Sequence, residues 1–432
     1  MSARRIPVMI LCGVMSLCGR AFAQSHTDFE QPPISYSATK PRTFDDLQAR
    51  FASGELRFSG SERDALKTVL DALHVPVESQ LLVFSKTSLQ RHRISPQRPR
   101  ALYFSDTAYV GWVPGGLTEV IIIDPQLGPV FYSFDLRDGQ REHPKLERDN
   151  DCLRCHGGNF VRDIPGIFAR SLFTDQSGEP LLRHGSVLVD DETPFEERWG
   201  GWYVTGYHGD EPHRGNVMSA ERGEALEFTP STRRPNTLTE FFKTRDYLRD
   251  TSDVVALLVL EHQTTMQNAL TRANFSSRRM IAYQHGLQKA FKEPLTDEPT
   301  YDSVKSVFES TADDVVDRLL FRNAAPLPSG VIGDPAFQER FLRDAPKSAA
   351  GHTLKDLELF DQIFAHRCSF LIYSDMFLEL PETLKTRIFD RLHRVLRDGK
   401  ADERYAYLPA AEKQRIYDIL RETHPDAKRL WQ

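Results

Sequence analysis

Between residues 81 and 134 the chain alternates short apolar runs with turn residues. The runs are rich in β-branched and aromatic side chains, and Pro-Gly-Gly, Asp-Pro and Leu-Gly-Pro separate them. Runs of this length and punctuation are typical of antiparallel strands. They occupy residues 81–84, 101–105, 109–113, 120–123 and 130–134. The pattern therefore predicts an antiparallel sheet, preceded by helices near residues 44–47 and 65–70.

Further strands and then helices are predicted downstream. Strands are expected at residues 168–173, 186–189 and 201–205, with a hairpin turn at 175–178. From about residue 235 the apolar spacing becomes helical, and residues 253–270 are densely apolar. Two later stripes have the same period: Leu357, Phe360, Phe364, Cys368 and Leu371, and then Leu384, Ile388, Leu392 and Leu396. We expect an irregular connection over 326–346, and a buried core position for Cys368.

The N-terminus has the features of a secretory leader. Arg4 and Arg5 precede an apolar stretch over residues 6–17, and Ala21-Phe22-Ala23 matches an A-x-A cleavage site. The apolar stretch is too short to remain as a membrane-spanning anchor. We therefore expect cleavage after Ala23, export to the periplasm and no transmembrane anchor in the mature chain. The net charge of −6 argues against nucleic acid and anionic membranes as partners.

Residues 149–160 read DNDCLRCHGGNF and contain the Cys-x-x-Cys-His pattern of covalent haem attachment. The pattern predicts one covalent haem c, with thioethers at Cys152 and Cys155 and with His156 as the proximal iron ligand. A thioredoxin-like redox pair would need a βαβ setting, which the polar flanks do not provide. A closed zinc site would need four ligands, and the sequence has no second Cys-x-x-Cys.

The order of elements predicts an α+β protein. Its N-terminal β-rich region would bear the c-type haem in mid-chain, and a mostly α-helical C-terminal region would follow. The expected divisions are a signal peptide over 1–23, an α+β domain over 24–150, a haem-attachment and β-rich segment over 151–234, and a helical domain over 235–432.

The two sides of the iron need different partners. The second ring nitrogen of His156 should donate to a carbonyl, which the turn at 164–166 can supply. On the other side, an electron carrier has a second His or Met, whereas an enzyme or gas sensor leaves that face open or weakly held.

Two segments offer distal candidates. The Gly-rich loop 199–218 carries His208, His213 and Met218, and residues 253–270 place His262 and Met266 on one helical face. We rank them in the order His213, His262, Met266 and Met218. Solvated loop histidines, or a core histidine beside a gap-filling methionine, are the alternatives. Glu261 is expected to be a partner or a solvated charge.

Several stretches carry a resemblance over nearly the whole mature chain. They are LVFSKTS (82–88), RALYFSD (100–106), YVGWV (109–113), DPQLGPVFY (124–132), CLRCH, ERWGGWYVTG (197–206), HRGN (213–216), VLEHQ (259–263) and CSFLIYS (368–374). The chain resembles a family of large, secreted, monohaem c-type proteins of environmental bacteria. The resemblance implies haem binding and export, and no particular reaction. It favours His213 and His262, whereas Arg214 departs from the apolar residue that the family tends to have there.

Three functional classes remain open at this point. The first is electron transfer, alone or within a periplasmic redox enzyme, with a redox partner protein or a small-molecule substrate. The second is a peroxidase- or oxygenase-like haem enzyme with an open distal site, in which His213 or His262 acts as acid-base group. The third is a haem-based sensor or binding module. The chain is longer than a bare electron shuttle requires.

Overall fold

The computed structural model describes residues 25–42, 45–136, 146–327, 330–397 and 403–432. The expected leader and its cleavage site after Ala23 lie outside these ranges. Among the helices within them, none combines the length and the apolar character needed to cross a membrane.

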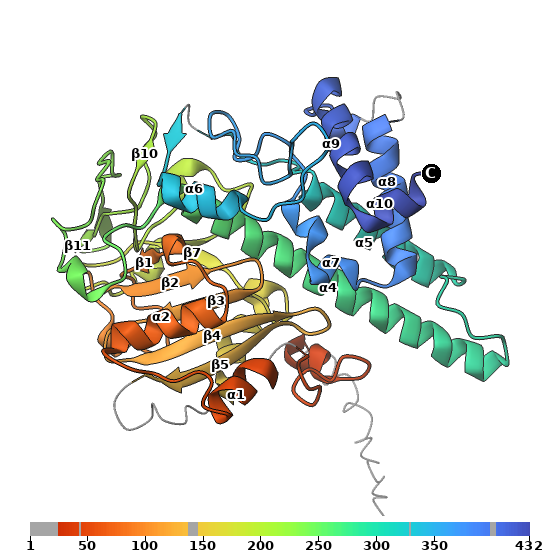
Figure 1. The fold of residues 1–432 in the computed structure, drawn as a ribbon, viewed down its shortest axis with the longest axis horizontal. Helices are drawn as coiled ribbons and strands as arrows, with labels where there is room; N and C mark the ends of the chain where they lie inside the picture. Colours follow the sequence, from red (N-terminus) through yellow and green to blue (C-terminus); the bar gives the residue numbers. More distant parts are fainter. Residues whose placement is uncertain (1–24, 43–44, 137–145, 328–329, 398–402) are drawn as a thin grey trace, which may run out of the picture.

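An antiparallel sheet dominates the N-terminal half (Figure 1), in the strand order β6-β5-β4-β3-β2-β1-β9. Its strands are β1 (Leu81–Val83), β2 (Arg100–Phe104), β3 (Ala108–Trp112), β4 (Leu117–Asp124), β5 (Gly128–Asp135), β6 (Glu147–Arg148) and β9 (Trp202–Tyr203). The five strands expected between residues 81 and 134 are confirmed. Six of the seven strands come from the N-terminal region, and β9 joins them from beyond the Cys-x-x-Cys-His motif by pairing with β1.

Alternation along the strands gives the sheet two buried faces. Leu82 and Ala101 belong to one hydrophobic cluster, together with α2 (Glu62–Ala72). Val83 and Tyr109 belong to the other, which includes the long helix α4 (Val254–Phe291). Because successive side chains of a strand point to opposite faces, the short apolar runs serve both clusters. A short helix, α1 (Asp45–Ala52), precedes α2.

Helix α4 runs from the sheet into the helical half of the molecule (Figure 1). The Asp253 side chain caps its first turn by accepting from Ala256 N–H (2.9 Å), and Lys292 ends it in a left-handed conformation. The densely apolar stretch over 253–270 forms the first part of this helix, which continues to Phe291. The helical half also contains α5 (Asp302–Leu319), α6 (Pro335–Leu342), α7 (Asp375–Leu378), α8 (Glu382–Arg397), α9 (Ala410–Thr423) and α10 (Pro425–Leu430).

Two expectations for the helical half are wrong. The stripe from Leu357 to Leu371 forms no α-helix: Leu357 and Phe364 pair in an antiparallel bridge, Leu359 has φ +62°, and Phe360 is exposed. The connection over 326–346 is not wholly irregular, because it contains α6 and the short strand β13 (Val331–Ile332). The second stripe is confirmed as α8, and Cys368 is buried in the core as expected.

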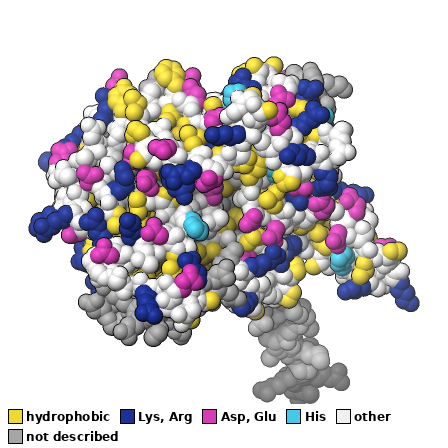
Figure 2. Space-filling view, viewed as in Figure 1, with side chains coloured by type: hydrophobic (Ala, Val, Ile, Leu, Met, Phe, Trp, Pro, Cys, Tyr) yellow, Lys and Arg dark blue, Asp and Glu magenta, His cyan; other side chains and the backbone are white. Residues whose placement is uncertain are grey.

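Small two-stranded pairs surround the main sheet. They are β7 (Ala169–Leu172) with β8 (Ser186–Val189), β10 (Tyr207–His208) with β13, and β11 (Ala220–Arg222) with β12 (Ala225–Glu227). The first pair confirms the expected hairpin. On the face of the molecule in Figure 2, basic and acidic side chains are interspersed, in agreement with the modest net charge.

Candidate haem site

The Cys-x-x-Cys-His motif forms one helical turn. The Asp149 side chain accepts from Asp151 N–H (3.0 Å) and starts this turn, which continues into α3 (Leu153–His156). Helical spacing of three and four residues brings Cys152, Cys155 and His156 together. All three line the same cavity, with Cys155 exposed and Cys152 partly buried.

His156 is held in one orientation. Its Nδ1 lies 2.9 Å from the carbonyl oxygen of Gly166, and Gly166 N–H donates back to the His156 carbonyl (2.8 Å). The rings of Phe131 and Phe168 pack against it, each with its centroid 5.0 Å from that of the imidazole. The expected carbonyl partner from the turn at 164–166 is confirmed.

The protonation state of His156 suits metal ligation. Burial lowers the pKa of the imidazole, although the bond to Gly166 opposes this shift. The ring is therefore neutral near pH 7, and the bond to Gly166 places the proton on Nδ1. No residue in the described ranges forms a hydrogen bond with Nε2, so its lone pair is available to a metal ion.

A residue of α4 supports this arrangement from behind. The Asn268 side chain accepts from Ile167 N–H (2.9 Å) and donates to the Ile167 carbonyl (2.6 Å). These two bonds fix the backbone directly after Gly166. Asn268 therefore positions the carbonyl that orients His156, and no sequence pattern had pointed to it.

The cavity lies on the α4 side of the sheet. It is open to solvent at its mouth. Alternate residues of the strands supply one wall, and α4 closes another side through Leu260 and Thr264. Apolar side chains of the lining include Val83, Leu102, Ile121, Phe160, Phe168 and Trp202.

An ion pair crosses the sheet inside the cavity. Arg100 on β2 pairs with Glu119 on β4 across Gly111 on β3. A side chain at Gly111 would place its Cβ only 2.5 Å from Nη2 of Arg100, so the Arg100 side chain would have to shift to make room for it. Arg170 also lines the cavity, and two arginines can pair with the carboxylate groups of a bound cofactor.

These residues fit a covalently bound haem. The motif supplies two thiols and an imidazole with a free lone pair, next to an apolar cavity with cations in its wall. Redox catalysis by the cysteines fits less well, because burial, with help from Asp149, raises the pKa of the Cys152 thiol to about 12.

The structure places His213 away from this cavity. His213 is fully buried, and its Nδ1 accepts from Gly215 N–H (2.9 Å). Its Nε2 lies 3.2 Å from Nε2 of His208, which is also buried. Neither histidine lines the cavity that contains His156. The first-ranked distal candidate and the alternative of solvated loop histidines therefore both lack support, because these rings bind each other in the interior.

The other distal candidates are not in the cavity lining either. Both ring nitrogens of His262 are engaged, Nδ1 by the Asp191 carboxylate (3.1 Å) and Nε2 by Ser369 Oγ (2.8 Å). Met266 is fully buried in the core, and Met218 packs against the other hydrophobic cluster. His262 thus corresponds to the alternative of a core histidine satisfied by hydrogen bonds.

The residues next to His262 on α4, Glu261 and Gln263, form hydrogen bonds with residues from distant parts of the sequence. The Glu261 carboxylate is buried, not solvated, and accepts from Arg198 Nη1 (2.6 Å) and Trp199 Nε1 (2.8 Å). Gln263 donates to Tyr109 Oη and to the Ser105 carbonyl, both at 2.7 Å. The VLEHQ block of α4 therefore connects the ERWGGWYVTG block to the sheet, which is a structural role.

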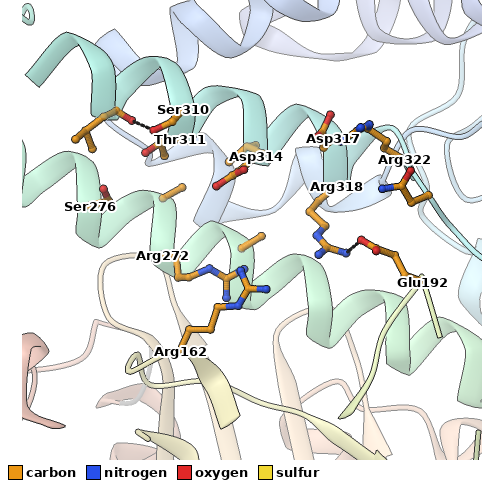
Figure 3. A pocket seen from close by; sticks show the side chains of 15 residues that line it. Arg162, Glu192, Arg272, Ser276, Ser310, Thr311, Asp314, Asp317, Arg318 and Arg322 are labelled. Carbon is orange, nitrogen blue, oxygen red and sulfur yellow. Dashed lines mark hydrogen bonds and ion pairs between the residues drawn. The ribbon is translucent and has the colours of Figure 1, made fainter. Parts of the chain in front are cut away.

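A second cleft lies between α4 and α5 (Figure 3). Arg162 and Arg272 point toward one another there, and burial together with this like charge lowers the pKa of Arg272 to about 10. Arg318 pairs with Glu192 (3.0 Å) and Arg322 with Asp317 (3.1 Å). The cleft contains no Cys or His in the described part of its lining, so it offers nothing to hold a haem iron.

Comparison of the chain with protein-family models, with curated proteins and with solved structures finds no match in any of the three. The family resemblance of the sequence blocks therefore stays a prediction.

Proposed function

We propose that this chain is an exported redox protein that carries one haem c, attached at Cys152 and Cys155 with His156 as axial ligand. The observation that carries the proposal is the convergence of these three residues on one cavity, where Gly166 fixes Nδ1 of His156 and Nε2 has no hydrogen bond to a described residue. When bound, the haem would supply one-electron chemistry and a site for a small ligand.

The cavity supports a haem enzyme with an open distal face better than a closed electron carrier. In the described part of its lining there is no Met, and His156 is the sole His. Tyr109 is a poor iron ligand, because burial raises the pKa of its phenol and two glutamines occupy its oxygen. We propose that the sixth iron position is open or weakly held.

Because His213 and His262 do not line the cavity, we propose that Glu119 and Arg100, which do, act on the bound molecule in their place. Glu119 and Arg100 face the space beside His156, where the Glu119 carboxylate can exchange a proton with a bound small molecule and the Arg100 guanidinium can stabilise negative charge on it. An open haem iron can bind peroxide or dioxygen, and we propose that the substrate belongs to this class.

Electron transfer remains a second candidate, supported by the exposure of the attachment site. Cys155 is exposed, and Phe160 in the cavity wall is 48% exposed. A haem attached there would have an edge near solvent, where a redox partner protein could deliver or remove electrons.

The covalent bond is the first test. After export in a host that attaches c-type haem, the denatured chain should keep its haem through acid acetone and give a c-type pyridine haemochrome. Cys152→Ser and Cys155→Ser should each lose one thioether. Cys368→Ser, at the third cysteine of the mature chain, should keep both. Haem that acid acetone extracts from the wild type would refute the proposal.

A further inference from the structure

Three side chains converge in the connection between α6 and α7, and none of them lines the haem cavity. Nδ1 of His352 lies 3.9 Å from Oδ2 of Asp356, and Nε2 of His366 lies 3.6 Å from the same oxygen. The two imidazole rings are 5.3 Å apart and nearly perpendicular, at 80°. One ligand atom from each residue lies within 4.8 Å of the other two.

The backbone brings Asp356 and His366 together. Leu357 pairs with Phe364 in an antiparallel bridge, and Ala365 N–H donates to the Asp356 carbonyl (2.8 Å). Residues on the two sides of this bridge are therefore neighbours, although nine residues separate them along the chain.

The third residue comes from the preceding turn. Ser348 N–H donates to the His352 carbonyl (2.9 Å), which closes the turn before Thr353. Thr353 N–H then donates to Oδ2 of Asp356 (3.0 Å) and holds this carboxylate toward the histidines.

His366 is the informative member of the cluster. Its side chain is only 4% exposed, yet neither ring nitrogen makes a hydrogen bond with a described residue. A buried polar group without a partner is costly, and in native proteins such a group is commonly satisfied by a bound ion or water. The nearby Glu412 carboxylate is bound by Arg367 through both oxygens and makes no hydrogen bond with His366.

We propose that His352, Asp356 and His366 bind a divalent first-row transition metal ion. Metal–nitrogen and metal–oxygen bonds of about 2.0–2.2 Å allow two ligand atoms of one ion to lie up to roughly 4.2 Å apart. The separations of 3.6 and 3.9 Å meet this limit. The third separation joins the ring nitrogens of His352 and His366 and lies within 4.8 Å. Because His352 is exposed, its side chain can rotate toward His366 and shorten this separation.

The donor set limits the kind of ion. Two imidazoles with one carboxylate suit zinc, ferrous iron and their neighbours, whereas calcium and magnesium prefer oxygen ligands throughout. Three protein ligands leave positions for water or a small ligand, as in metal sites that bind substrates. This second metal would be independent of the haem.

Zinc provides the direct probe. Haem-loaded protein is freed of loose metal, dialysed against zinc chloride in slight excess, and analysed for zinc per chain; iron reports the haem separately. We expect one zinc per wild-type chain. His352→Ala and Asp356→Asn should each weaken zinc binding by about 100-fold or more, at least as much as loss of a supporting residue does. Zinc should also raise the thermal midpoint of the wild type and not of these variants.

Two control variants distinguish this site from zinc binding elsewhere on the chain. His285→Ala removes a partly exposed histidine that pairs with one carboxylate, Asp297 at 3.0 Å, and should leave zinc binding unchanged. Cys152→Ser/Cys155→Ser should also retain the zinc, whether or not the wild type carries haem. A wild type that binds no zinc, or zinc that persists in His352→Ala and Asp356→Asn but is lost in the cysteine variant, would overturn the proposal.

Discussion

At the residue scale, the buried pair of His208 and His213 makes stability depend on pH. Burial, with the neighbouring His208, lowers the pKa of His213 to about 3, and burial lowers that of His208 as well. An unfolded chain binds these protons near pH 6.5, so acidification through that range favours unfolding, by roughly 1.4 kcal/mol for each unit of pKa shift.

We therefore predict that the free energy of unfolding falls as the pH is lowered from 7 toward 4, and that His213→Gln makes this dependence shallower. Denaturant titrations at several pH values measure both. His92→Gln removes an exposed histidine and should preserve the wild-type slope. If the free energy of unfolding depended on pH equally in the wild type and in His213→Gln, burial of His213 would not be a cause of this dependence.

The buried ion pair of Arg198 and Glu261 gives a second residue-scale prediction. Burial raises the pKa of Glu261 to about 7, although Arg198 opposes the shift. Glu261→Leu leaves the Arg198 cation buried without its carboxylate, and we expect a loss of about 3–5 kcal/mol in the free energy of unfolding. Arg198→Met combined with Glu261→Leu should recover most of this loss.

An exposed pair is the matched comparison. On the surface, Nε of Arg222 lies 2.7 Å from Oε1 of Glu227. Glu227→Leu should lower the free energy of unfolding by less than about 1 kcal/mol. If Glu261→Leu and Glu227→Leu lowered the free energy of unfolding equally, burial of the Arg198–Glu261 pair would not explain the loss in Glu261→Leu.

At the scale of elements, α4 links the core to the haem motif through Asn268. Asn268→Leu removes both bonds to the Ile167 backbone, and we expect a loss of about 1–3 kcal/mol in stability. Because the Gly166 carbonyl then loses its support, the reduction potential of the haem should shift too.

Asn274→Leu is the control on the same helix. Asn274 bonds to the Pro125 carbonyl (3.3 Å), away from the haem motif, so its loss should reduce stability and leave the potential unchanged. Equal shifts of potential in both variants would show that Asn268 has no special part in orienting His156.

Elements with a strong local pattern could be predicted from the sequence, and those set by distant contacts could not. Strands β2 to β5 and helix α8 carry enough alternation or helical spacing to fix their type. The stripe at Leu357 to Leu371 has helical spacing by coincidence: Phe364 and Leu371 are buried, but Phe360 is exposed, and the left-handed conformation of Leu359 interrupts the backbone.

The same distinction applies to the site. Cys152, Cys155, His156 and the carbonyl of Gly166 are close in sequence, so spacing predicted their grouping. His262 is satisfied by Asp191 and Ser369, 71 and 107 residues away, and no spacing rule reveals such partners. His262 therefore looks available for iron ligation in the sequence, although both of its ring nitrogens make hydrogen bonds in the folded chain.

At the scale of the whole molecule, the Cys-x-x-Cys-His motif lies in mid-chain, and elements from both sides of it line one cavity. The sheet that precedes the motif supplies one wall, and β9 and α4, which follow it, supply Trp202, Leu260 and Thr264. The long chain thus builds a chamber beside His156 that is open to solvent at its mouth, with Arg100 and Glu119 in its wall. An open distal face in this chamber is what would separate this protein from a simple electron carrier.

Carbon monoxide binding reports whether the distal face is open. The reduced, haem-loaded protein should show a high-spin absorption spectrum, and carbon monoxide should bind at once and shift it, because no His or Met in the described cavity lining competes with it on the side opposite His156. His213→Ala, His262→Ala and Met266→Ala should give the same result as the wild type. A sharp low-spin spectrum that carbon monoxide leaves unchanged would contradict an open distal face, since it would require a second strong ligand on the iron.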